Sequence, residues 1–210
     1  MKKPETLAAL EEFGRVRLSQ SFFMRDFLYS EIANLHGISN IPDNPDLAID
    51  VGKWLCEELL EPLNATFGRI EIRSAYRSCE LNGFGNQMTK RKRGRYNCAE
   101  NEKNYGRHIW DRLDGEGMKG ATACIVIPWF ADRYAAGADW RAIAYWIHDH
   151  LPYSEMEFFS TLCAFNISWH ERPKRRITSY VAPKGQLDIG SETPEMRANW
   201  YADFPRLRTA

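Results

Sequence analysis

The sequence predicts an α+β protein in which helices pack on one side of an antiparallel sheet. Three observations carry this prediction. Residues 45–67 place apolar side chains at helical spacing, residues 69–74 alternate apolar with polar side chains, and residues 121–128 form a β-branched apolar run. The chain has 210 residues, which is enough for one domain with its own core. We expect a single domain over residues 1–190 and a peripheral tail over residues 191–210.

The N-terminal third is predicted to be helical. A short helix capped by Ser21 or Ser30 ends before the turn-rich segment 37–45, where Gly, Asn and Pro residues cluster. A longer amphipathic helix follows over residues 45–67, and Gly68 breaks it. Cys56 lies beside the apolar face of this helix, so we expect it to be a small buried thiol.

The remainder of the chain is predicted to contain the sheet. A helix is expected at residues 139–150, and residues 80–105 are polar and rich in Gly and Asn, which indicates a long irregular excursion. The expected strands are residues 70–74, 121–127, 163–169 and 177–182.

Composition excludes several classes of protein. Lys and Arg number 28, as do Asp and Glu, and 44% of the residues are hydrophobic, so the chain is not of the disordered type. No run approaches the roughly 18 apolar residues that span a bilayer. The N-terminal segment lacks the apolar stretch of a secretory signal, so we expect a cytoplasmic protein. A phage lysis protein is the alternative, because such proteins reach the cell wall by another route.

Two basic runs occur, at residues 90–95 and 172–176. Neither accompanies an aromatic RNA-binding motif or a DNA-reading helix, so nucleic acid is not expected as a partner, and a polyanion contact is the weaker alternative. The five cysteines form no CxxC pair, which argues against a zinc ribbon or a disulfide framework and favours a reducing compartment.

The five histidines separate into two groups. His36, His148 and His150 fall at expected helix ends, where a cationic side chain is favourable. His108 and His170 instead lie close to a tryptophan and to a glycine-rich turn or a predicted strand. These two histidines are the candidates for chemistry.

Residues 72–82 read Ile-Arg-Ser-Ala-Tyr-Arg-Ser-Cys-Glu-Leu-Asn. With the segments 18–31 and 60–63, they resemble the zinc D-alanyl-D-alanine carboxypeptidases, relatives of the hedgehog signalling domain. The resemblance spans residues 18–172. In that family a Ser-x-Tyr-Arg-Ser strand precedes a Ser-x-His-x-x-Gly-x-Ala-x-Asp metal motif, and a later histidine flanked by tryptophan completes the site. The resemblance therefore implies a hedgehog-like peptidase fold.

The resemblance also implies a zinc site. His108 resembles the first ligand and His170 the third, while Cys124 falls where the family has its aspartate ligand. Arg77 matches the family arginine that contacts the substrate carboxylate or the developing oxyanion. Zinc accepts two imidazoles and a thiolate and keeps a fourth position for water.

This sequence departs from the family pattern in three ways. Gly106 replaces the motif serine, residues 111–119 resemble an insertion, and Cys124 supplies a thiol in place of a carboxylate. A thiolate donates more charge to zinc, which would make the metal a weaker Lewis acid. Alternatively, Asp111 or Asp114 supplies the missing carboxylate.

The general base of the family is a glutamate. Glu155, Glu157 and Glu171 are candidates, and we take Glu157 as the expected base. A purely structural interpretation stays open beside this one. Cys124 could be a buried apolar thiol, and Arg77 could form a structural ion pair with a nearby glutamate.

The expected function is a zinc-dependent peptidase that acts on peptidoglycan stem peptides, as a D-Ala-D-Ala carboxypeptidase or endopeptidase. The alternative is a catalytically inactive member of the fold that serves as a binding or structural module, as in the hedgehog relative. Metal analysis of the purified protein separates the two.

Overall fold

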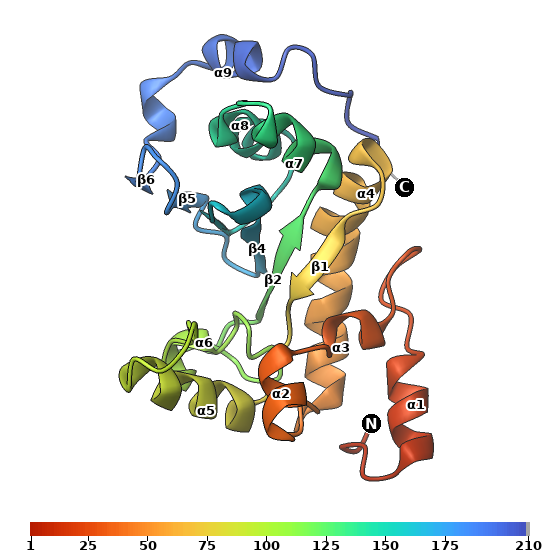
Figure 1. Cartoon of the computed structure of the whole chain (residues 1–210). Coiled ribbons are helices and arrows are strands. Elements are labelled where there is room, and N and C mark those ends of the chain that lie inside the picture. Colours follow the sequence, from red (N-terminus) through yellow and green to blue (C-terminus); the bar gives the residue numbers. More distant parts are fainter. Residues whose placement is uncertain (209–210) are drawn as a thin grey trace.

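The computed structural model describes residues 1–208 as a sheet with helices around it (Figure 1). The α-helices are α1 (Leu7–Gly14), α2 (Glu31–His36), α3 (Pro45–Leu55), α4 (Glu61–Phe67), α5 (Cys79–Lys90), α6 (Asn101–Asn104), α7 (Pro128–Ala135), α8 (Trp140–His150) and α9 (Pro194–Trp200). The shorter segments are η1 (Met24–Phe27), η2 (Cys56–Leu60), η3 (Thr161–Cys163) and η4 (Ile189–Ser191), of which η2 is a π-helix and the others are 3₁₀ turns. The strands are β1 (Glu71–Ser74), β2 (Gly120–Val126), β3 (Glu155–Phe158), β4 (Phe165–His170), β5 (Arg176–Ser179) and β6 (Gly185–Gln186).

The sheet has six strands in the order β1-β2-β4-β3-β5-β6. This confirms the α+β class. All neighbours are antiparallel except β3 and β5, which are parallel, so the prediction of a purely antiparallel sheet is wrong at this pair. The reason lies in β4, whose two edges are already taken by β2 and β3. The next strand pairs at the free edge of β3, and one reversal after β4 makes it parallel to β3.

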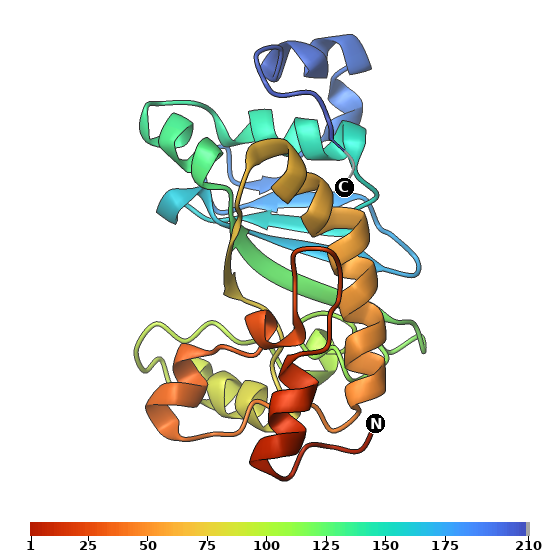
Figure 2. The same ribbon diagram turned by 90° about the vertical axis from the view of Figure 1, so that its right-hand side faces the viewer.

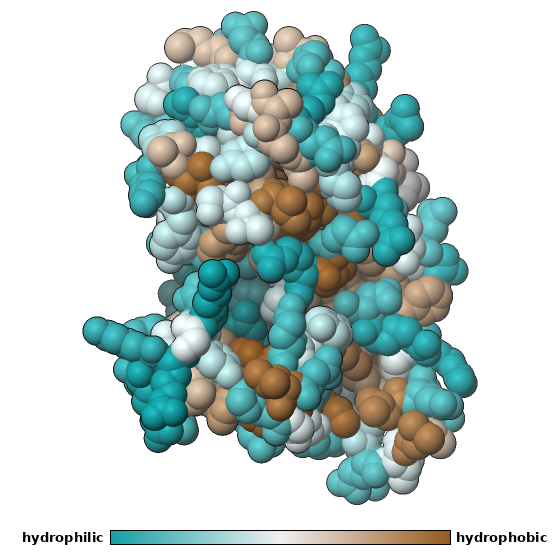
Figure 3. Space-filling model, in the orientation of Figure 1, coloured by the Kyte–Doolittle hydropathy of each residue, from teal (hydrophilic) through white to brown (hydrophobic). Residues whose placement is uncertain are grey.

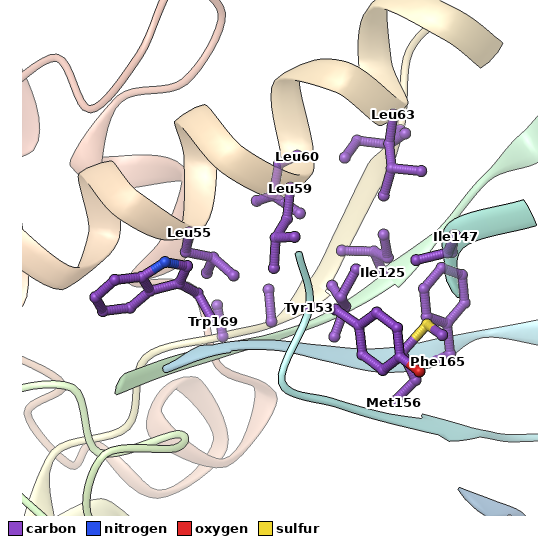
Figure 4. Close-up of a cluster of buried hydrophobic side chains, with 14 of the residues drawn as sticks. Leu55, Leu59, Leu60, Leu63, Ile125, Ile147, Tyr153, Met156, Phe165 and Trp169 are labelled. Atoms are coloured by element: carbon purple, nitrogen blue, oxygen red, sulfur yellow. The ribbon is translucent and has the colours of Figure 1, made fainter. Parts of the chain in front are cut away.

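The hydrophobic core lies between the sheet and the helices that cover one of its faces. Figure 2 shows the long helix of α3 and α4 lying across this face. In Figure 4, Leu59 and Leu63 of that helix point toward the sheet around Ile125, and Leu55 lies beside Trp169. Leu55, Leu59, Leu63 and Ile125 are fully buried. Alternate strand residues supply the apolar side of the sheet, so the opposite face is left to their polar neighbours.

The predicted helix over residues 45–67 is present as one continuous rod, α3-η2-α4. Asn44 caps it, since its side chain accepts a hydrogen bond from the backbone of Leu47. Pro62 has no N–H to donate to the preceding turn, and the π-helical segment η2 occurs directly before it. Cys56, in η2, is fully buried as expected.

Glu61 follows the π-helical segment and is turned inward. Its side chain is buried and accepts hydrogen bonds from the Ser19 hydroxyl at 2.7 Å, the Ser21 hydroxyl at 2.9 Å and the Ser21 backbone N–H. A buried carboxylate with three donors is well satisfied. This contact fastens the N-terminal segment to the long helix.

The prediction of a long irregular segment over residues 80–105 is largely wrong. Ser78 caps a regular helix, α5, and α6 follows it. The glycines here permit close packing: a Cβ on Gly85 would lie 2.5 Å from the Cys98 sulfur. The Asn82 amide donates to the Ala99 carbonyl at 3.0 Å, which ties α5 to the segment before α6. Small residues and amides therefore serve helix packing in this segment.

The expected strands at residues 70–74, 121–127 and 163–169 are confirmed as β1, β2 and β4. The fourth is present as the shorter β5, and the expected helix at residues 139–150 is confirmed as α8, with Asp139 as its cap. Strand β3 was not predicted. Its four residues, Glu-Met-Glu-Phe, do alternate polar with apolar side chains, so the signal was present but was not used.

The segment predicted as a peripheral tail contacts the rest of the chain. Trp200 of α9 packs against Tyr145 of α8 with ring centroids 5.8 Å apart, and Phe204 lies 5.0 Å from Trp129. Within residues 1–208, no helix combines the length and the apolar character that a bilayer crossing requires.

Candidate functional site

The face of the sheet turned away from the long helix carries side chains in three rows that run across the strands. Residues that are register partners on neighbouring strands lie opposite each other, and every second residue of a strand points to the same face. Partners on one face therefore form a row across the sheet. The first row contains Ser74, Cys124, Asn166, Glu157 and Thr178. The second row contains Thr122, Ser168, Glu155 and Arg176, and the third contains Gly120 and His170.

His108 is buried beside the first row. Its Nδ1 lies 2.8 Å from the Ala75 carbonyl, and because a carbonyl only accepts, Nδ1 carries the proton. Burial, and next the positive charge of Arg77, lower the pKa of His108 to about 3, although hydrogen bonds with Ala75 and Asn166 act in the opposite direction. His108 is therefore neutral at physiological pH, with an unprotonated Nε2 next to Asn166.

This lowered pKa makes stability depend on pH. In the unfolded chain His108 becomes protonated below about pH 6.5, whereas in the folded chain it becomes protonated only below about pH 3. The unfolded state then holds more protons, so stability falls as the pH is lowered through this window. Between pH 7 and pH 4 we expect the wild type to lose about 3 kcal/mol more unfolding free energy than His108→Gln. Urea denaturation of both proteins at the two pH values measures this, and equal losses would contradict it.

Cys124 and Arg77 lie together at the β1 end of the first row. Burial raises the pKa of the Cys124 thiol, Arg73 and Arg77 lower it in part, and the net value is about 11. Ser74 is the register partner of Cys124, and the Arg77 guanidinium contacts the Ser74 hydroxyl at 3.4 Å. The thiol is protonated at neutral pH and has cationic neighbours.

Arg77 has no carboxylate partner within residues 1–208. Its other polar side-chain contact is the Cys98 sulfur at 3.5 Å, and both of its partners are neutral. Glu71, which could have paired with it, pairs with Arg69 at 3.2 Å. The backbone N–H of Arg77 donates to the His108 carbonyl at 2.8 Å, which fixes Arg77 beside the histidine. The half-buried guanidinium therefore carries an uncompensated charge on this face.

The three candidates for a general base lie in different places. Glu157 is in the first row opposite Asn166, whose amide donates to it at 3.3 Å. Glu155 is in the second row and is held by Arg107 at 2.6 Å and by Arg176. Glu171 accepts a hydrogen bond from the Lys119 backbone at 2.7 Å, beyond the third row. Only Glu157 shares a row with Cys124, with β4 between them.

His170 does not join His108 and Cys124. Its register partner is Gly120, its Nε2 lies 3.1 Å from Asp114, and its Nδ1 lies 3.0 Å from the Arg172 carbonyl. Four residues of β4 separate it from the position opposite Cys124, which is about 13 Å along a strand. The ligand set inferred from the resemblance is therefore not brought together, because the strand register places His170 in the third row.

The residue that stands beside His108 and Cys124 is Asn166, which the sequence interpretation missed. Counting in twos back from His170 along the strand would have found it, since Asn166, Ser168 and His170 share one face.

The alternative carboxylates do not complete a site either. Asp111 is buried and accepts a hydrogen bond from the Asp43 backbone at 2.7 Å. Asp114 reaches His170 but not His108, and it also accepts hydrogen bonds from the backbones of Glu116 and Met118 at 2.9 Å. Among residues 1–208, no three His, Cys, Asp or Glu side chains are grouped as a metal ion would require. Zinc binding stays a prediction from the resemblance.

Two cavities open over the rows. The larger, about 460 Å³, lies over β3, β4, β5 and β6, and the smaller, about 170 Å³, lies next to His170. Arg107, Glu155 and Ser168 line both, so the Arg107–Glu155 ion pair forms the wall between them. The space-filling view shows a hollow with hydrophilic walls on this side of the molecule (Figure 3).

The two basic runs differ in their surroundings. In the second run, Arg172 pairs with Glu116 at 2.6 Å, Arg176 pairs with Glu155, and Arg175 donates to the Leu151 carbonyl. The first run follows the end of α5 and is mostly exposed. The second run therefore supports the fold, and the absence of a nucleic-acid partner stays a prediction.

Comparison with known proteins finds no match to any family model, curated protein or solved structure.

Proposed function

We propose that the chain is a peptide-binding module with a peptidase-like fold, and that it holds a peptide by its C-terminal carboxylate at Arg77. The unpaired guanidinium of Arg77 carries this proposal. A half-buried cation with only neutral neighbours gains an anionic ligand at low cost, because little water remains to be removed. The planar fork of arginine fits a carboxylate with two hydrogen bonds.

The first row supplies partners for the rest of such a peptide. His108 presents an unprotonated ring nitrogen near the row, and Asn166 presents a carboxamide. A peptide backbone needs both donors and acceptors, and this row has both. The resemblance to D-Ala-D-Ala carboxypeptidases supports peptidoglycan stem peptides as the ligand class.

The proposal involves binding without hydrolysis. Asn166 occupies the place beside His108 and Cys124 where a third ligand would be needed, and a carboxamide is a poor zinc ligand. Arg73 and Arg77 lie near Cys124 and would repel a dication there. The donor set of the first row therefore does not fit a catalytic zinc ion.

A zinc peptidase acting on peptidoglycan stem peptides is the second candidate. One observation favours it: His108 donates Nδ1–H to a backbone carbonyl and keeps Nε2 free, which is the arrangement found in zinc-binding histidines. Cys124 in the first row is the second possible ligand. This candidate needs a third ligand that the first row lacks.

Calorimetric titration with a peptide ending in D-Ala-D-Ala tests the binding proposal. We expect the free-acid peptide to bind and its C-terminal amide to bind about tenfold to a hundredfold more weakly. We expect the free-acid peptide to bind Arg77→Ala more weakly than the wild type by a similar factor. Arg69→Ala is the matched control, because Arg69 is exposed and pairs with Glu71. Equal affinities for acid and amide would overturn the proposal.

Zinc content separates the two candidates. After dialysis against zinc and removal of the excess, we expect the wild type to hold much less than one zinc ion per chain and to leave the D-Ala-D-Ala peptide intact. One zinc ion per chain that is lost in both His108→Gln and Cys124→Ala, together with peptide cleavage, would establish the peptidase instead.

A further inference from the structure

The larger cavity has a charge arrangement that the proposed function does not use. Its floor is the part of the first and second rows that lies on β4, β3 and β5, and its volume is about 460 Å³. Five charged side chains line it: Arg107, Arg176, Lys184, Glu155 and Glu157. Their pairing decides what the cavity can bind.

Three of these side chains form one linked group of ion pairs with a net charge of +1. Glu155 is buried, and one carboxylate oxygen pairs with Arg107 at 2.6 Å while the other pairs with Arg176. A buried carboxylate between two guanidinium groups is stable only as a complete unit. These three side chains are therefore a fixed wall of the cavity.

The other two charges are left without partners of opposite sign within residues 1–208. Glu157 is half-buried, and its hydrogen bond is with the neutral Asn166 amide at 3.3 Å. Lys184 is exposed at the cavity margin, in the connection between β5 and β6. One cavity therefore presents an unpaired anion and an unpaired cation to the same ligand.

An aromatic surface stands at the same margin. Tyr180 lines the cavity, is 59% exposed, and is stacked on Phe159 with ring centroids 5.7 Å apart and an interplanar angle of 13°. The stacking holds the Tyr180 ring in place, so a flat or apolar group of a ligand has a rigid surface to cover.

We propose that this cavity binds an α-amino acid, either free or as the zwitterionic end of a larger molecule. Its ammonium group pairs with Glu157, its carboxylate pairs with Lys184, and its side chain lies on Tyr180. A zwitterion pairs with Glu157 and Lys184 at once, and it leaves the ion pairs of Arg107, Glu155 and Arg176 intact. This site is separate from Arg77 and does not depend on it.

Calorimetric titration with phenylalanine, as both enantiomers, tests the proposal. We expect one enantiomer to bind, and N-acetylphenylalanine and phenylalaninamide to bind at least about tenfold more weakly, because each lacks one of the two charges. Tyr180→Ala should weaken the binding of phenylalanine more than that of alanine.

The variants distinguish charge recognition from a general loss of structure. Glu157→Gln should weaken phenylalanine about tenfold but leave N-acetylphenylalanine unchanged, and Lys184→Met should do the same with phenylalaninamide. Glu12→Gln and Lys53→Met, at exposed positions on α1 and α3, are the matched controls. Arg77→Ala should leave phenylalanine binding intact even where it abolishes peptide binding.

Three outcomes would overturn the proposal. The first is that neither phenylalanine enantiomer binds at millimolar concentration. The second is that phenylalanine and its blocked derivatives bind with equal affinity. The third is that Glu157→Gln weakens the binding of every ligand by the same factor. Each of these outcomes leaves the carboxylate test at Arg77 unaffected, so the two proposals can fail independently.

Discussion

Trp110→Ala is expected to lower the free energy of unfolding by about 3–5 kcal/mol, the usual cost of removing a large buried aromatic side chain. Trp110 is fully buried, with its ring centroid 5.3 Å from that of Phe27 and 6.2 Å from that of Tyr76. Its indole N–H also donates to the Thr122 carbonyl at 3.1 Å, which ties the segment carrying His108 to β2. Removing the ring leaves both a cavity and an unpaired carbonyl. Urea denaturation measures the change.

Trp54→Ala is the matched control for this substitution. Trp54 is 43% exposed and stacks on Trp169 at the surface of the long helix, so its removal leaves no closed cavity. We expect a loss well below that of Trp110→Ala. Equal losses for the two variants would show that Trp110 is not the centre of packing inferred from its burial.

Gly120→Ala is expected to destabilise the protein by about 1–3 kcal/mol or more, which is the range for forcing extra volume into a packed site. A Cβ at this position would lie 2.2 Å from the Gly106 carbonyl oxygen and 2.7 Å from the His170 ring. The first of these neighbours is backbone, so the turn that leads to His108 would have to shift. Thermal and urea denaturation measure the loss.

Gly115→Ala provides the comparison. A Cβ on Gly115 meets nothing within 4 Å, so we expect its stability to stay within about 0.5 kcal/mol of the wild type. Gly120→Ala should also disturb the site, because the shifted turn carries His108. If Gly120→Ala is as stable as Gly115→Ala, the close approach of the turn to β2 is not a constraint on the fold.

Much of the fold was predictable where side-chain periodicity is strong. The long helix has a clear helical pattern, β1 lies in an alternating segment, and β2 and β4 are rich in apolar residues. Strands β3 and β5 are parallel, and β4 lies between them in the chain, so no hairpin turn connects them and no local signal reveals the pair. Strand order depends on contacts between distant segments, which a local pattern does not contain.

The candidate site was predictable only in part. His108, Cys124 and Arg77 were identified from sequence resemblance, and the structure places them near one another. His170 was assigned to the same group because it follows a tryptophan, but the strand register moves it to another row. Asn166 carries no chemical signal of its own. Its position matters only because it faces Cys124 across β2 and β4, and register is a property of the pair of strands.

The π-helical turn before Pro62 amounts to one residue more than a regular α-helix would use over the same length. Deleting that residue would restore uniform hydrogen bonding but would rotate every later side chain of the helix by about 100° around its axis. Glu61 would then leave Ser19 and Ser21, and Leu63 would turn from the sheet toward solvent. The number of residues in this helix therefore cannot change even by one without misplacing the side chains that follow. An insertion or deletion here is far less tolerable than a substitution.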